Sequence, residues 1–145
     1  MPTEKLTEDL LKRLLAASSP EEYFHQDETL DLKLCDYLNE LLAKHDGMKR
    51  ADVVRASKLN STVVYDIFGN KSLPGRDHAI MLAFGLHCSL DETQRILRLA
   101  GVSLLWPKNR RDAIIIWCIQ QGYTLDECDE ELWRLNESTL FNTEK

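Results

Sequence analysis

Apolar residues recur at intervals of three and four positions through most of this 145-residue chain. One such series is Leu6, Leu10, Leu11, Leu14 and Leu15, and another is Leu30, Leu34, Leu38, Leu41 and Leu42. This spacing places the apolar side chains on one face of an α-helix. No stretch alternates apolar and polar residues for long enough to indicate a sheet. The pattern therefore predicts an all-α protein that begins with short N-terminal helices.

Local signals indicate where these helices begin and end. Ser18-Ser19-Pro20 ends the first leucine series, and Ser19 with Glu22 is typical of a capping box that opens a second helix at Pro20. His45-Asp46-Gly47 ends the later series. We predict an N-terminal helical segment over residues 1–29, a helical bundle over residues 30–101, and a C-terminal helical hairpin over residues 102–145 that packs on the bundle.

A repeat with an offset of 35 residues covers the C-terminal half of the chain. Arg76-Asp77 aligns with Arg111-Asp112, and Ser89-Leu90-Asp91-Glu92 aligns with Thr124-Leu125-Asp126-Glu127. Each copy has an apolar helix, a short turn, and a Ser or Thr N-cap followed by Asp and Glu, which the helix dipole favours in a first turn. The repeat predicts two stacked helical hairpins.

The second hairpin contains an unusually apolar helix. Residues 113–119 are apolar around most of the circumference, so we expect neighbouring helices or a second subunit to cover them. Trp106 and Pro107, just before this helix, are expected to anchor the hairpin on the bundle. Alternatively, the basic residues that follow them, Lys108, Arg110 and Arg111, would contact nucleic acid.

The net charge of −6 conceals a segregated distribution. Residues 47–111 contain 11 Lys and Arg against 5 Asp and Glu, whereas residues 1–46 contain 5 against 11 and residues 112–145 contain 2 against 8. A basic central segment can face phosphate groups despite an acidic average. Ion pairs between helices would produce the same segregation, so charge alone does not assign a function.

Residues 48–75 contain the pattern that says most about function. A short helix is predicted over residues 50–57, a turn at Lys58-Leu59, and a second short helix that Asn60 caps and that ends near Phe68. Four apolar residues fall where a helix-turn-helix buries its apolar side: Val53, Leu59, Val64 and Ile67. Gly69-Asn70 tolerates positive φ, and Pro74 prevents the second helix from continuing.

This segment resembles the Xre/lambda-repressor-like helix-turn-helix family, which has a five-helix bundle, here over residues 30–101, whose third helix reads the DNA major groove. The resemblance implies a cytoplasmic transcriptional regulator that binds double-stranded DNA, in this family usually as a dimer. Arg50 matches a phosphate-contacting position, Asn60 matches the N-cap of the recognition helix, and Lys71 matches a loop position that meets the DNA backbone. The DNA-binding set that we predict is Lys49, Arg50, Asn60, Ser61, Thr62, Tyr65, Asp66 and Lys71.

Three further cations lie within or beside this segment: Arg55, Lys58 and Arg76. With Lys49, Arg50 and Lys71 they make six, and about three to five phosphate contacts would make binding strongly salt-dependent. For Arg55 we favour a solvated helical face over a phosphate contact.

The segment departs from the family pattern at three points. Lys58 occupies a turn position usually held by glycine, where a left-handed backbone costs another residue about 1 kcal/mol. Val54 stands where a close helix crossing favours alanine. The outward face of the predicted second helix, which consists of Ser61, Thr62, Tyr65 and Asp66, has no Arg, Lys or Gln. Ser and Thr side chains discriminate poorly between bases. A second interpretation is therefore a protein-interaction adaptor that keeps the bundle without reading bases.

No pattern typical of an enzyme or a metal site is found. The four cysteines (Cys35, Cys88, Cys118 and Cys128) lack a CxxC, and the four histidines lack metal-ligand spacing. The sequence has no nucleophile elbow and no phosphate-binding glycine loop. No apolar run approaches the roughly 20 residues of a membrane helix. We therefore expect no enzymatic activity, no cofactor, no metal and no membrane partner.

Overall fold

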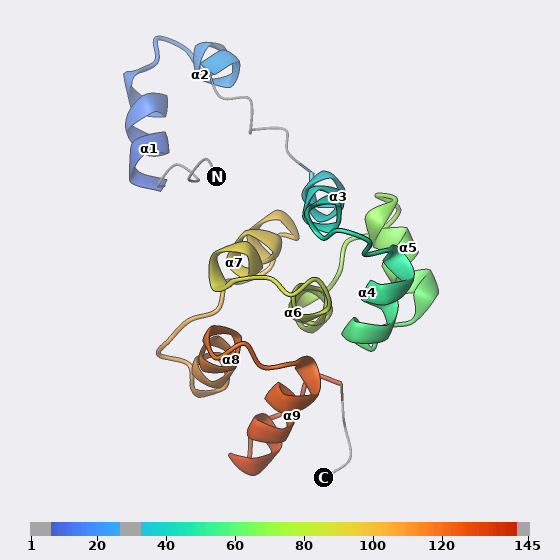
Figure 1. Ribbon diagram of the computed structural model, residues 1–145. Coiled ribbons are helices and arrows are strands. Elements are labelled where there is room, and N and C mark those ends of the chain that lie inside the picture. The colour runs from blue at the N-terminus through green and yellow to red at the C-terminus, as the bar shows by residue number, and fades with distance from the viewer. Residues whose placement is uncertain (1–6, 27–32, 142–145) are drawn as a thin grey trace. The chain divides into compact units, whose positions relative to one another are not determined.

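The computed structural model describes residues 7–26 and 33–141, and all regular secondary structure in these ranges is α-helical (Figure 1). This agrees with the predicted all-α class. The chain forms two compact units, residues 1–32 and residues 33–145. The C-terminal hairpin belongs to the same unit as the bundle that precedes it.

The first unit contains α1 (Thr7–Ala16) and α2 (Pro20–Gln26), which contact each other. The predicted cap of α2 is half right. The Ser19 hydroxyl accepts a hydrogen bond from the Glu22 backbone N–H at 3.2 Å, as expected. The Glu22 carboxylate, however, accepts from the backbone N–H of Ser18 at 2.8 Å, one residue earlier than a capping box requires.

The second unit begins with five helices: α3 (Leu34–Lys44), α4 (Arg50–Ser57), α5 (Ser61–Phe68), α6 (Arg76–Gly85) and α7 (Leu90–Leu99). The hub of this unit is α6, whose residues from Ala79 to Gly85 are all buried and which contacts α4 and α7. In turn, α3 contacts α5 and α7, and α5 also contacts α4. Leu30, the first residue of the predicted second leucine series, lies outside the described residues.

The closest helix crossing in the bundle joins α4 to α6. A Cβ atom at Gly85 would lie 2.9 Å from the Cβ of Ser57 and 3.2 Å from the carbonyl oxygen of Val53. Real Cβ atoms do not approach so closely, so glycine is required at this position. Val54, which the sequence placed at a close crossing, is only half-buried, and Ser57 makes the contact instead.

The predicted C-terminal hairpin consists of α8 (Arg110–Gln120) and α9 (Leu125–Arg134). Besides contacting each other, α8 contacts α7 and α9 contacts α6. In the repeat, α6 corresponds to α8 and α7 corresponds to α9. The α7–α8 contact and the α6–α9 contact are therefore equivalent, and the two hairpins form a pseudo-two-fold pair. Their caps also match: Ser89 with Glu92 and Thr124 with Glu127 form capping boxes at α7 and α9.

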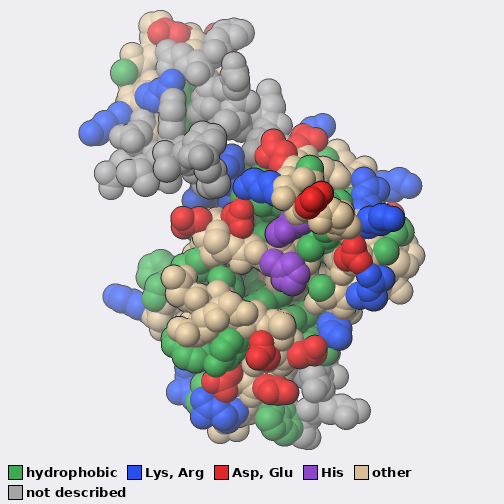
Figure 2. Space-filling view, in the orientation of Figure 1, with side chains coloured by type: hydrophobic (Ala, Val, Ile, Leu, Met, Phe, Trp, Pro, Cys, Tyr) green, Lys and Arg blue, Asp and Glu red, His purple; other side chains and the backbone are tan. Residues whose placement is uncertain are grey.

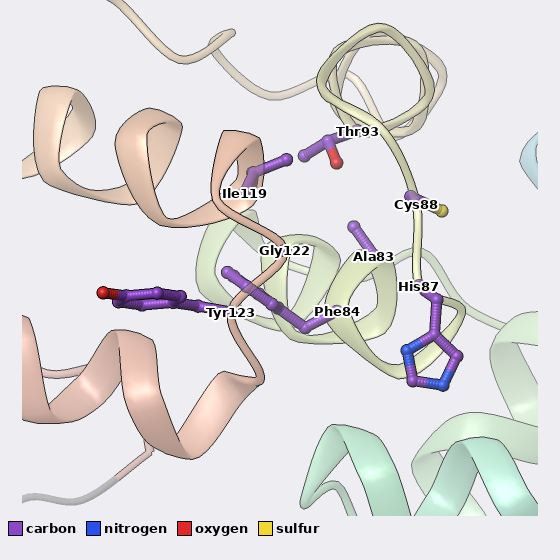
Figure 3. A pocket seen from close by; sticks show the side chains of 8 residues that line it. All are labelled: Ala83, Phe84, His87, Cys88, Thr93, Ile119, Gly122 and Tyr123. Carbon is purple, nitrogen blue, oxygen red and sulfur yellow. The ribbon is translucent and has the colours of Figure 1, made fainter.

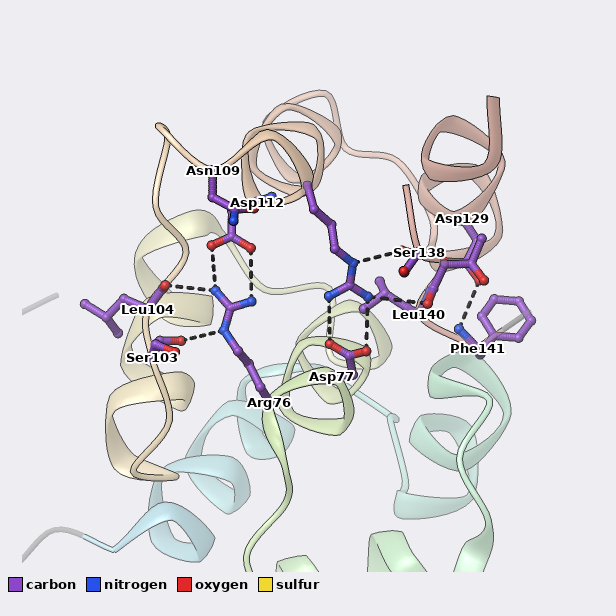
Figure 4. Close-up of polar contacts among 12 residues, drawn as sticks. Arg76, Asp77, Ser103, Leu104, Asn109, Asp112, Asp129, Ser138, Leu140 and Phe141 are labelled. Carbon is purple, nitrogen blue, oxygen red and sulfur yellow. Dashed lines mark hydrogen bonds and ion pairs between the residues drawn. The ribbon is translucent and has the colours of Figure 1, made fainter. Parts of the chain in front are cut away.

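Reciprocal ion pairs join the two copies (Figure 4). Arg76 at the start of α6 donates to both carboxylate oxygens of Asp112 in α8, at 3.0 and 2.7 Å. Arg111 in α8 donates to both oxygens of Asp77 in α6, at 2.9 and 3.0 Å. Each arginine also donates from Nε to the carbonyl 27 residues later, Arg76 to Ser103 at 2.9 Å and Arg111 to Ser138 at 2.8 Å. The sequence repeat is therefore also a repeat of hydrogen bonds.

The connection between α7 and α8 is anchored by a residue other than the one predicted. Trp106 is 60% exposed, whereas Leu105 is buried, so the prediction that Trp106 anchors the hairpin is wrong. The Gln94 side chain holds the backbone of Leu105 through hydrogen bonds of 3.0 and 2.8 Å. The Leu105 side chain is therefore removed from water, while its backbone N–H and C=O groups both keep hydrogen-bond partners.

Candidate nucleic-acid interface

The predicted pair of short helices is present with the expected bounds, α4 over Arg50–Ser57 and α5 over Ser61–Phe68. Lys58, Leu59 and Asn60 join them. Lys58 adopts a left-handed conformation with φ 62° and ψ 13°, the backbone that the family pattern fills with glycine. The Leu59 side chain is buried, and the Leu59 backbone N–H donates to the Ser57 hydroxyl at 3.3 Å. Val53, Val64 and Ile67 are buried, as predicted.

The first turn of α5 is capped by Asn60 and exposed to solvent. The Asn60 side chain accepts a hydrogen bond from the Thr62 backbone N–H at 2.8 Å, as the sequence predicts. Ser61 and Thr62 in the first turn are exposed, and Tyr65 one turn later is 45% exposed. Together with the half-buried Asp66, these side chains form the outward face of α5.

Three predicted cations lie at the start of α4 or just after α5: Lys49, Arg50 and Lys71, all exposed. Lys49 precedes α4, and its backbone N–H donates to the Asp52 carboxylate at 2.8 Å. Lys71 follows α5, and its backbone N–H donates to the carbonyl of Asp66 at 2.8 Å. None of the three makes an ion pair with another described residue. Figure 2 shows Lys and Arg side chains, with a carboxylate among them, on the side of the molecule where α4 and α5 lie.

Arg50 is positioned by two residues outside the predicted DNA-binding set, Phe68 and Asn39. Its guanidinium lies over the Phe68 ring, 5.5 Å from the centroid, and donates to the Asn39 side chain at 3.4 Å. The Asn39 amide also donates to the carbonyl of Phe68 at 3.2 Å. This network links α3, α4 and α5 and orders the Arg50 side chain. No local pattern reveals it, because Asn39 is far from α5 in the sequence.

The other three cations of the segment are paired with carboxylates. Arg55 pairs with Asp52 on its own helix, Lys58 with Asp126 of α9 at 3.6 Å, and Arg76 with the buried Asp112. Arg55 therefore fits the solvated helical face that we favoured. Arg76, one of the six cations considered for phosphate contact, instead joins the two repeats through its pair with Asp112. Of the six cations, Lys49, Arg50 and Lys71 make no ion pair with a described residue, and Arg76 is the one held in a buried pair.

Two residues on the outward face have ambiguous chemistry. Asp66 is half-buried, and no described cation forms an ion pair with it, so its charge lies unneutralised beside the proposed interface. Tyr65 does not stack on Phe68, whose ring is buried beneath Arg50. The Tyr65 side chain therefore remains available to an incoming ligand.

The second basic run, which follows Trp106, is mostly neutralised. Arg110 pairs with Glu137 at 2.9 Å, and Arg111 pairs with Asp77. Among its three basic residues, Lys108 alone makes no ion pair with a described residue. This disfavours the alternative in which the α7–α8 connection contacts nucleic acid.

A small cavity lies between the α6–α7 turn and the α8–α9 turn (Figure 3). It has a volume of about 100 Å³ and is lined by Ala83, Phe84, His87, Cys88, Thr93, Ile119, Gly122 and Tyr123. Small-molecule sites usually measure about 300–1,000 Å³, so this cavity is too small for most substrates. Within residues 7–26 and 33–141, no group of three His, Cys, Asp or Glu side chains could hold a metal ion.

Comparison with protein-family models, curated proteins and solved structures finds no match to this chain. None of the helices that the structure describes is long and apolar enough to cross a lipid bilayer.

Proposed function

We propose that this protein binds double-stranded DNA as a transcriptional regulator, with α4 and α5 acting as a helix-turn-helix of the Xre/lambda-repressor-like type. In this proposal α5 enters the major groove, and Ser61, Thr62 and Tyr65 face the base edges. The main support is the combination of a left-handed turn at Lys58 and a buried Leu59, which leave the polar face of α5 exposed.

The flanking cations supply the phosphate contacts of the proposal. Lys49 and Arg50 lie at the start of α4, where Arg50 meets Phe68 at the C-terminal end of α5, and Lys71 lies just after α5, so basic side chains gather near that end of the exposed helix. Phe68 and Asn39 order the Arg50 side chain, which lowers the entropy lost when it binds a phosphate. Contacts of this kind fix the register of a protein on the duplex, whereas the groove contacts specify sequence.

The composition of the outward face favours modest sequence specificity. Ser61 and Thr62 can bond to several bases, and Asp66 accepts hydrogen bonds only, which suits a cytosine amino group. We propose homodimerisation as the means of reading two half-sites, because two weakly specific modules gain specificity when they bind together.

A protein-interaction adaptor is the second candidate. It is favoured by the absence of Arg, Lys and Gln from the outward face and by the unneutralised Asp66, which phosphates would repel. In that case α5 would contact a protein, and the affinity for DNA would be negligible at low salt.

Fluorescence anisotropy with a labelled random-sequence duplex at low salt distinguishes the two candidates. DNA binding predicts that Lys49→Glu and Lys71→Glu each weaken binding by about tenfold, through lost attraction and added repulsion. Lys108→Glu, the same charge change on the α7–α8 connection, serves as the matched control and should leave the affinity within about twofold. Absence of binding by the native protein would support the adaptor, and equal losses in all three variants would place the interface elsewhere.

A further inference from the structure

The 35-residue repeat allows each position on α8–α9 to be compared with its equivalent on α6–α7. Gly85 of α6 lies against Ser57 of α4, and Met81 and Leu82 precede it by one helical turn on the same side of α6; all three are buried. The equivalent residues of α8 are Ile116, Trp117 and Gln120. Trp117 is 48% exposed, whereas Leu82 is fully buried. One copy of the repeat therefore has a helix over this face, and the other copy leaves it open to solvent.

The open face of α8 has the character of a contact surface. The Trp117 ring meets the edge of the Tyr123 ring, with 5.3 Å between centroids, and Ile116 beside it is half-buried. A large aromatic side chain that a neighbour holds in place loses little freedom on binding, and tryptophan is enriched among the residues that dominate protein interfaces.

Comparison of equivalent positions on α7 and α9 indicates the charge that a protein bound to the open face would carry. Glu92 of α7 pairs with Lys44 of α3 at 3.4 Å. Its equivalent, Glu127 of α9, accepts a hydrogen bond from the Thr124 backbone N–H at 2.8 Å but makes no ion pair with any described residue. A cation equivalent to Lys44 is therefore missing at Glu127.

A second position reverses its charge between the copies. Arg95 of α7 lies over the ring of Tyr37 in α3, 4.8 Å from the centroid, and its equivalent on α9 is the exposed Glu130. Figure 2 shows carboxylate and hydrophobic side chains together over the part of the molecule where α8 and α9 lie. The uncovered hairpin is thus apolar along α8 and acidic along α9.

We propose that Ile116, Trp117, Gln120, Glu127 and Glu130 form a docking surface for a basic amphipathic helix of a partner protein. The apolar face of that helix would cover Trp117, and its Lys or Arg side chains would pair with Glu127 and Glu130. A second copy of the same surface is disfavoured, because residues 112–145 contain 8 Asp and Glu against 2 Lys and Arg. The surface shares no residue with the proposed DNA interface, so either proposal can fail alone.

The test uses the full chain and a labelled synthetic helix with one leucine face flanked by lysines. Anisotropy should show saturable binding, and a peptide with glutamate in place of lysine should not bind. Trp117→Ala should weaken binding by about tenfold or more, as expected for a central aromatic contact. Trp106→Ala, at an exposed tryptophan outside the surface, is the matched control and should leave binding within about twofold.

Glu130→Lys provides a second variant that leaves the α8 contacts intact. It should weaken binding of the lysine peptide and restore some binding of the glutamate peptide. Equal losses with Trp117→Ala and Trp106→Ala, or no saturable binding of the lysine peptide, would overturn the proposal. Sedimentation that shows a dimer disrupted by Trp117→Ala would also overturn it, since the occupant would then be a second copy.

Discussion

Arg76 and Asp112, 36 positions apart, form a two-pronged ion pair that joins α6 to α8. Asp112 also accepts a hydrogen bond from the Trp106 backbone N–H at 3.0 Å, and Arg76 donates to the carbonyl of Leu104 at 2.9 Å. The pair therefore fixes the connection between the hairpins as well as the two helices.

Removing the arginine should destabilise the second unit strongly. Arg76→Ala leaves the buried Asp112 carboxylate without its cation, and breaking a buried pair in this way costs about 3–5 kcal/mol. Arg111→Ala is the matched control, because its partner Asp77 is better solvated. Urea unfolding should show a clearly smaller loss for the control. Equal losses would mean that burial of Asp112 does not determine the cost.

Gly85→Ala tests the crossing of α4 and α6. The added methyl group would overlap Ser57, and overpacking of this kind costs about 1–3 kcal/mol. Gly75→Ala makes the same change where nothing lies within 4 Å of the added atom and φ is negative, so it lacks the steric overlap and loses only the preference of about 0.5–1 kcal/mol for glycine over alanine at the N-cap of α6. Thermal unfolding of the two variants measures the difference, and a stable Gly85→Ala protein would contradict the close approach.

Lys58 allows a direct test of the left-handed turn. Lys58→Gly and Lys58→Ala both remove the ion pair with Asp126, but only alanine retains a Cβ at φ 62°. The glycine variant should therefore be more stable than the alanine variant by about 1 kcal/mol. Chemical denaturation of both proteins gives the value directly. The opposite order would indicate a different backbone at this turn.

The half-buried Cys88 and the buried Cys128 should react slowly in the folded protein. Burial raises the pKa of the Cys88 thiol, and a hydrogen bond with Cys118 together with burial raises the pKa of Cys128. Because the thiolate is the reactive form, both thiols stay protonated and unreactive at mildly alkaline pH. Alkylation followed by peptide mass spectrometry should show labelling of Cys88 and Cys128 only after unfolding in guanidinium chloride. Rapid labelling of the native protein would show that this core opens readily.

Local features of the sequence predicted much of the fold. The bounds of α4 and α5, the Asn60 cap and the two hairpins all depend on residues close together in the chain, where periodicity and capping are informative. The repeat was also visible as two Arg-Asp pairs 35 residues apart.

The role of Arg76 could not be predicted in the same way. Its position beside the basic segment indicated a phosphate contact, but its actual partner lies in the other hairpin, and only the packing of the two copies brings Asp112 to it. The Arg50 site has the same origin, because Asn39 and Phe68 meet it from different helices. Local sequence patterns identify the charged residues, whereas tertiary contacts decide which of these residues lack an ion-pair partner.

The central claim is that α4 and α5 bind the DNA backbone through three cations. The most direct measurement is the dissociation constant for a short random duplex as salt is raised. Three phosphate contacts predict a slope of about −3 in log affinity against log salt concentration, and Lys71→Ala should reduce its magnitude by about 1. Absence of binding at low salt, or a slope that Lys49→Ala and Lys71→Ala leave unchanged, would contradict the account.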